Sequence, residues 1–300
     1  MCDNFLVLWL GDKRGYFSDW LTQQWVRATG RTVNLIDETW LDGPLGNTRL
    51  IGKDVFAKYA EDHDLEVVQD GVRGLIPDFQ ELRIDDTGVV ASTVRRFYER
   101  TSEYELDAWS EWCGLFRPLG WALAILFSRR LQQLNVPLSP LDSSKGITSS
   151  VLQLRDPGSG HVVQTAWVRE LLATGNVLYA GCYSICRVPG YPNPCVKVVF
   201  PLPNGNAIVM MKPETHADGS LSVTSAGETF GDPGFYFVVQ GEDGVARARY
   251  VRSLKETIHV YPSESDIVRA DHILWLWGIQ FLRLHYRMHV TANAQVPTVF

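Results

Sequence analysis

The sequence predicts an α+β protein: a mainly helical N-terminal half, residues 1–143, followed by a C-terminal antiparallel β-barrel, residues 144–300. Apolar residues of the first half recur at helical spacing, whereas apolar and aromatic residues after Ser144 alternate as they do in strands. Glycine, proline, asparagine and aspartate punctuate these later runs as turns. About eight strands with nothing helical between them are typical of an antiparallel sheet that closes on itself.

The first half contains several elements that the apolar spacing defines. Phe17, Leu21 and Trp25 share one helical face, and Gly30 is a natural stop for that helix. The expected elements are a strand at 5–10, a helix at 16–30, a strand at 32–36, a helix at 53–61, an irregular aromatic face at 92–112 and a helix at 120–135.

The last two expected strands of the barrel lie in the stretch 271–290. Residues 271–278 place His272, Leu274 and Leu276 on one face, and Gly278 permits a bend. The following run separates into two faces. One face carries Ile279, Phe281, Arg283, His285 and Arg287, and the other carries Gln280, Leu282, Leu284, Tyr286 and Met288.

Bulk properties exclude some partners. The formal net charge is −6 and no lysine or arginine run occurs, so nucleic acid is not an expected partner. The most apolar window, residues 119–127, is far shorter than a membrane span requires, so a cytoplasmic protein is expected. The 5 cysteines match no zinc spacing and are expected to be reduced and buried, with no metal or cofactor.

Charged residues on apolar strand faces are the candidate ligand contacts. If the face containing Tyr250, Arg252 and Glu256 points inward, Arg252 can hold a carboxylate head in a forked arrangement. The alternative is an exposed strand with solvated charges. Arg283 and His285 form an anion clamp if they face the interior, but the apolar companion face is the better candidate for burial. The candidate ligand-binding residues are Tyr250, Arg252, Glu256, His272, Trp275, Trp277, Arg283 and His285.

The succession of strands between residues 176 and 288 resembles, in its texture, the lipocalin and fatty-acid-binding (calycin-like) barrels. It also resembles the lipid-binding barrels encoded in enediyne and polyketide biosynthetic clusters. The resemblance covers about half of the chain and supplies no catalytic residue. It implies a cavity for a long apolar molecule.

These observations lead to one principal hypothesis and two alternatives. The principal hypothesis is binding of a hydrophobic small molecule, a fatty acyl, polyene or polyketide-like compound of secondary metabolism, inside the barrel. The first alternative is an enzyme of the same shape, a cyclase, isomerase or hydrolase acting on such a substrate. The second is a non-catalytic protein-interaction module whose helical half forms a homodimer or partner surface.

Overall fold

A single branched antiparallel sheet dominates the computed structural model, which describes residues 8–46, 48, 54–84, 89–113, 147–171, 177–241, 245–264 and 266–291. The main path of this 14-stranded sheet has the order β2-β4-β5-β6-β7-β8-β9-β12-β13-β14-β3. Its strands are β2 (Glu66–Val68), β4 (Ile147–Arg155), β5 (Val162–Leu171), β6 (Val177–Val188), β7 (Tyr191–Leu202), β8 (Gly205–Thr215), β9 (Leu221–Ser225), β12 (Leu254–Pro262), β13 (Val268–Leu276), β14 (Ile279–Val290) and β3 (Tyr104–Trp112).

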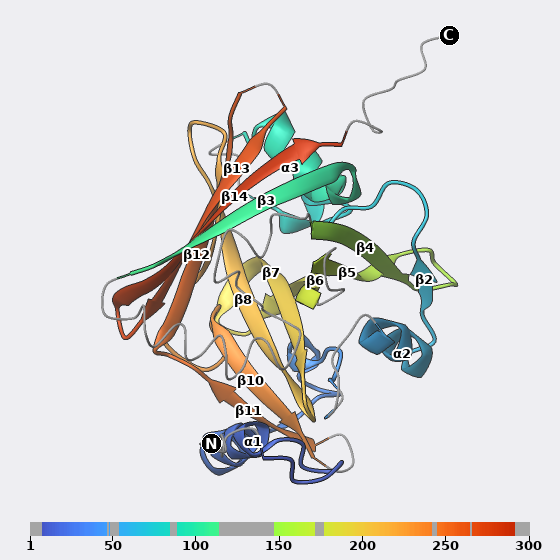
Figure 1. Ribbon diagram of the computed structural model, residues 1–300, viewed down its shortest axis with the longest axis vertical. Coiled ribbons are helices and arrows are strands. Elements are labelled where there is room, and N and C mark those ends of the chain that lie inside the picture. The colour runs from blue at the N-terminus through green and yellow to red at the C-terminus, as the bar shows by residue number, and fades with distance from the viewer. Residues whose placement is uncertain are drawn as a thin grey trace.

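Strand β8 is the branch point. Its first residues, Gly205 to Val209, pair with β10 (Phe235–Gln240), whereas Lys212 to Thr215 pair with β9. Strand β10 continues the branch through β11 (Val245–Tyr250) to β1 (Arg31–Asn34). The two groups of strands diverge from β8, so one lies towards α1 and the other rises away from it (Figure 1).

Helices cover the ends of this sheet. Helix α1 (Phe17–Thr29) packs against β10 and β11 at the lower end of the molecule, and α3 (Ser92–Glu99) packs against β12 and β13 (Figure 1). Helix α2 (Asp54–Asp62) adjoins β2. Short 3₁₀ turns lie at Thr39–Leu41, Phe79–Leu82 and Thr101–Glu103.

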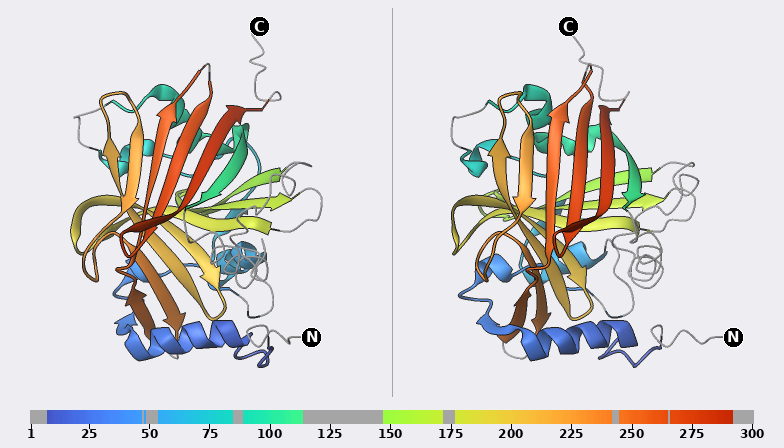
Figure 2. Two further views of the ribbon diagram at one scale, coloured as in Figure 1. Left: turned by 60° about the vertical axis from the view of Figure 1, so that its left-hand side comes forward. Right: turned by 90° about the vertical axis from the view of Figure 1, so that its left-hand side faces the viewer.

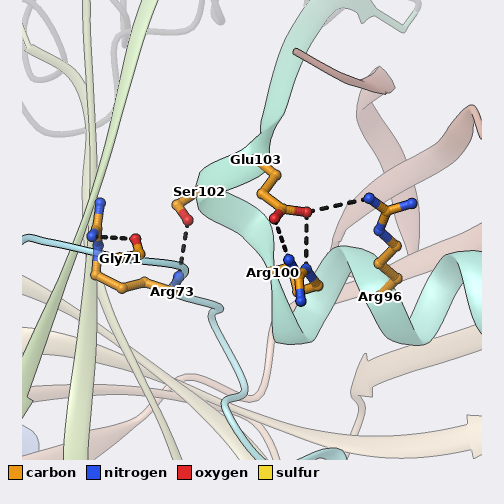
Figure 3. A network of polar contacts seen from close by, with 6 residues as sticks. All are labelled: Gly71, Arg73, Arg96, Arg100, Ser102 and Glu103. Atoms are coloured by element: carbon orange, nitrogen blue, oxygen red, sulfur yellow. Dashed lines mark hydrogen bonds and ion pairs between the residues drawn. The ribbon is translucent and has the colours of Figure 1, made fainter. Parts of the chain in front are cut away.

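A polar network fixes the turn between α3 and β3. Glu103 accepts hydrogen bonds from Arg96 and Arg100, and the bond from Arg100 is the main cause that lowers the pKa of Glu103 (Figure 3). Nearby, the backbone N–H of Arg73 donates to Ser102 Oγ, while Arg73 Nε donates to the carbonyl of Val151 at 2.7 Å. The start of β3 is thereby tied to β4.

Two buried apolar clusters occupy opposite faces of the central strands. One contains Trp40, Phe56, Leu154 and Tyr236 beneath α2, and the other contains Phe97, Val198 and Val260 beside α3. The separation follows from strand periodicity, because successive side chains point to opposite faces of a sheet. In β7, for example, Val199 belongs to the first cluster and Val198 to the second.

The expected fold class is wrong in two respects. The first 143 residues are not mainly helical in their described part, because β1, β2 and β3 from this segment join the sheet. The expected aromatic face at 92–112 is a short helix followed by β3. The sheet is also not a closed barrel, since β2 and β3 end the path without pairing to each other, and closure would need that pairing.

Several local expectations are confirmed. Helices at Phe17–Thr29 and Asp54–Asp62 and a strand at Arg31–Asn34 lie where the spacing predicts them. All strand pairs described are antiparallel, but residues after 144 form 11 strands, β4 to β14, instead of about eight. The expected helix at 120–135 and the first half of the strand expected at 5–10 lie outside the described residues, and residues 8–10 form only an isolated bridge from Trp9 to Tyr16.

Some expectations stay predictions. The domain boundary after residue 143 falls outside the described residues, although strands from its two sides pair, as β2 does with β4. No described helix has the length and apolar character needed to cross a membrane, as the sequence predicts.

The branch point depends on a close backbone approach that only glycine permits. A Cβ atom on Gly205 would lie 2.0 Å from the carbonyl oxygen of Val238 in β10. We therefore expect Gly205→Ala to lower the free energy of unfolding by about 1–3 kcal/mol, because the strands must separate to accept the methyl group. Urea unfolding measures this change. Gly158→Ala is the control, since its nearest neighbour would be 3.5 Å away. Equal stability losses in both variants would contradict this account.

Candidate functional site

A cavity of about 720 Å³ lies between the two groups of strands that diverge from β8. Side chains of β5 to β8 and β10 form one wall, and side chains of β9, β12, β13 and β14 form the other. Figure 2 shows β12, β13 and β14 side by side above α1, whose residues Trp25 and Val26 also line the cavity. The volume falls within the range of about 300–1,000 Å³ that is usual for small-molecule sites.

Strand alternation makes most of the lining apolar. On β12, Ile258 and Val260 face the cavity, and on β14 the inward residues include Leu282 and Leu284. Their β14 neighbours Arg283, His285 and Arg287 are absent from the lining. The aromatic lining residues are Trp25, Phe97, Tyr98, Trp167, Tyr179, Tyr183, Phe200, Phe235, Phe237 and Tyr286.

A carboxylate and an imidazole meet on this wall. Glu256 of β12 and His272 of β13 are placed side by side by the β12–β13 pairing, and Glu256 Oε2 lies 2.7 Å from His272 Nε2. Their side chains are only 12% and 14% exposed. The imidazole also stacks on Tyr286, with ring centroids 6.4 Å apart. The N–H at Nε2 donates to the carboxylate, so a neutral His272 ring keeps Nδ1 as an acceptor.

A buried cation lies on the facing wall. Arg169 of β5 is 7% exposed, donates from Nη2 to the carbonyl of Leu106 at 3.2 Å, and has its guanidinium carbon 5.6 Å from the Trp167 ring centroid. Its Nε has no hydrogen-bond partner among the described residues. Burial lowers the pKa of Arg169, but arginine starts above 12, so the guanidinium remains charged at neutral pH.

Three tyrosines extend the polar lining, which also includes Asp19, Thr22, Gln23 and Asn206. The hydroxyls of Tyr179 and Tyr183 are 2.6 Å apart on one face of β6, and Tyr286 lies on β14. Desolvation by burial raises the pKa of each of them, so all three keep their protons at neutral pH. Gly181 leaves the space for this arrangement, because a Cβ at that position would be 2.6 Å from the Tyr179 hydroxyl.

The structure brings together only two of the candidates named from the sequence. Glu256 and His272 line the cavity and form a pair, whereas the other six are absent from the lining. Arg252 is exposed and pairs with Glu228 at 2.8 Å, and Trp277 is 74% exposed at the β13–β14 turn. Tyr250 packs against Tyr236 in the other cluster.

The remaining three candidates also lie away from the cavity. Arg283 donates to Gln280 at 3.3 Å, and His285 contacts Asp271 at 2.6 Å. Trp275 occupies the β13 position after Leu274, so alternation directs its side chain to the opposite face.

Arg169, Tyr179, Tyr183 and Tyr286 were not identified from the sequence as site residues. The sequence signal that could have identified them is strand alternation, in which every second residue lies on the same face. Trp167 and Arg169 share a face of β5, and Tyr179 and Tyr183 share a face of β6 on either side of Gly181. Each pair looks like ordinary core or surface until the opposite wall is known, because that wall comes from strands about one hundred residues later.

Comparisons with known proteins give one informative similarity. The chain is 29% identical over 219 residues to the uncharacterized membrane protein YndJ of Bacillus subtilis (strain 168), a match that covers 71% of this chain and 37% of that protein. The chain therefore spans little more than a third of this relative's length. No family model matches the chain, and no solved structure matches it. The resemblance to lipocalin-type barrels thus gains no support, and the expected cytoplasmic location and homodimer stay predictions.

The buried tyrosines lead to a prediction about alkaline pH. Their folded-state pKa values lie above the unfolded value of about 10, so their contribution to stability is complete below that pH and is lost as the pH rises further. We expect phenolate absorbance to show a late-titrating group of tyrosines that ionise only as the protein unfolds. Tyr286→Phe should reduce the amplitude of this late phase. Titration of every tyrosine near pH 10, with native circular dichroism retained, would contradict the prediction.

Proposed function

We propose that this protein binds a hydrophobic small molecule, such as a fatty acyl, polyene or polyketide-like compound, in the cavity between its diverging strands. The supporting observation is the apolar cavity of about 720 Å³. Protein interiors are close-packed and contain few voids larger than a water molecule, so an apolar space of this size is typical of a binding site.

The lining supports a particular class of ligand. Aliphatic and aromatic side chains from both walls surround most of the cavity, and the charged and imidazole groups of the described lining are Asp19, Arg169, Glu256 and His272. Burial of apolar area is the main favourable term for such a ligand, and the few polar groups set its orientation. Native mass spectrometry of the purified protein, followed by denaturing extraction, tests whether such a compound co-purifies.

Filling the cavity should abolish binding. Ala207 of β8 is buried and faces the cavity, so Ala207→Phe places a ring where the ligand would lie. We expect its affinity for the neutral dye Nile red, measured by fluorescence, to fall at least about tenfold, or 1.4 kcal/mol. Val223→Phe repeats the test from the other wall.

The matched control removes an exposed aromatic side chain instead. Trp277→Ser deletes the most exposed of the described tryptophans without touching the cavity, so dye affinity should be unchanged. Loss of binding in Trp277→Ser, with binding retained in folded Ala207→Phe, would place the dye on the surface and reject the cavity as the site.

The Glu256–His272 pair supports a second proposal, in which the protein acts on the bound molecule as an isomerase, cyclase or hydrolase. A carboxylate that holds an imidazole at 2.7 Å orients it for proton transfer, and both groups border the cavity. His272 would exchange a proton with the ligand through its remaining ring nitrogen, and Glu256 would stabilise the imidazolium that forms.

Catalysis predicts different bound compounds in wild-type and variant protein. We expect Glu256→Gln to slow proton transfer by about 10²-fold or more, so that unreacted substrate is retained, whereas wild-type protein carries product. Liquid chromatography with mass spectrometry of extracts from the same host distinguishes the two. Arg252→Gln is the control, because Arg252 lies outside the cavity. Identical extracts from all three proteins would count against an enzyme and leave the binding role intact.

A further inference from the structure

The cavity lining contains a buried positive charge that the described chain leaves without a carboxylate partner. Among the described lining residues, Arg169 is the only lysine or arginine. We infer that the ligand carries an anionic head group, a carboxylate, which Arg169 binds. This inference rests on the proposed binding function and specifies the chemical class of the ligand.

The local electrostatics support this assignment. Among the described residues, the Arg169 guanidinium donates to the neutral carbonyl of Leu106, and no carboxylate oxygen lies within 4.0 Å of its nitrogen atoms. Asp107 acts on it through space only, and Glu256 is occupied by His272. A buried charge without a counter-charge is unfavourable, and a carboxylate at this position would remove that penalty.

The single positive charge of Arg169 favours a carboxylate over a phosphate as the head group. One guanidinium matches one negative charge, and its planar fork suits the two oxygens of a carboxylate. A phosphate monoester carries nearly two charges at neutral pH and would leave one unmatched in the same lining. The Trp167 ring beside Arg169 offsets part of the desolvation of the cation but supplies no hydrogen-bond acceptor of the strength of a carboxylate.

The tyrosines supply further donors to the same anion. In the Tyr179–Tyr183 pair one hydroxyl donates to the other, so one hydroxyl hydrogen of the pair remains available. Tyr286 lines the same cavity as Arg169 and the Tyr179–Tyr183 pair. Because burial keeps these phenols protonated, they act as donors to an anion and do not repel it.

The experiment compares two ligands that differ only in their head group. Dodecanoic acid and dodecan-1-ol are titrated against Nile red-loaded protein at pH 8, where the acid is ionised because carboxylic acids have pKa values of about 4. Wild-type protein should bind the acid at least about tenfold tighter than the alcohol, as expected for a charge-assisted hydrogen bond. Arg169→Met should abolish this preference by weakening the acid alone.

Two further variants make the test independent of folding defects. Arg283→Met removes an arginine from the outer face of β14 and should leave the acid-to-alcohol ratio unchanged. Tyr286→Phe keeps the ring and removes only the hydroxyl, so it should lower acid affinity several-fold with little effect on the alcohol. If Arg169→Met does not fold, Tyr286→Phe tests whether the acid head group binds at this polar part of the cavity.

The outcomes separate this inference from the function on which it rests. Two outcomes would contradict the assignment of an anionic head group to Arg169 and leave hydrophobic binding in place. One is equal binding of acid and alcohol by wild-type protein. The other is an acid preference that survives both Arg169→Met and Tyr286→Phe. Failure of the dye and of both dodecyl compounds to bind would overturn the proposed function itself.

Discussion

The change of partner along β8 is the constraint on which the rest of the structure depends. A strand that pairs with β10 over its first half and with β9 over its second forces its neighbours apart, because one edge of a strand can hydrogen-bond only one partner at each residue. The space between the diverging strands is the cavity. The close approach at Gly205 holds β10 on β8 at the start of this divergence, and α1 covers that end of the molecule.

The distribution of polar groups in the cavity follows from the same divergence. Each wall contributes its inward face by alternation, so a polar residue at an inward position is buried whether or not it has a partner on its own wall. Glu256 and His272 satisfy each other because β12 and β13 are paired neighbours. Arg169 has no such acidic partner among the described residues of β5 and β6, and its guanidinium donates to the backbone carbonyl of Leu106 in β3. The walls therefore differ: one carries a paired acid and base, and the other carries a cation beside phenols.

Sequence periodicity was sufficient for features that depend on neighbouring residues. It placed α1 and put His272 and Leu274 on one side of β13, both of which the structure confirms, but it left open which face of β14 points inward. It failed where the partner is distant in sequence. Strand β3 alternates as a strand should, but its aromatic residues also fit an irregular helical face, and the pairing with β14 that decides between them joins residues 104–112 to 282–290.

The open edge of the sheet explains why a strand count could not separate a barrel from this fold. Both have antiparallel neighbours with alternating side chains, and they differ in whether the terminal strands of the path pair with each other. Here β3 approaches the β4–β5 edge without a ladder to either strand, and the Arg169 side chain reaches across to the Leu106 carbonyl. A side-chain bond thus links β3 to β5, whose own edges are already paired with β4 and β6. The residue that bridges this gap is also the buried cation of the cavity, so the open edge and the polar end of the cavity are parts of one arrangement.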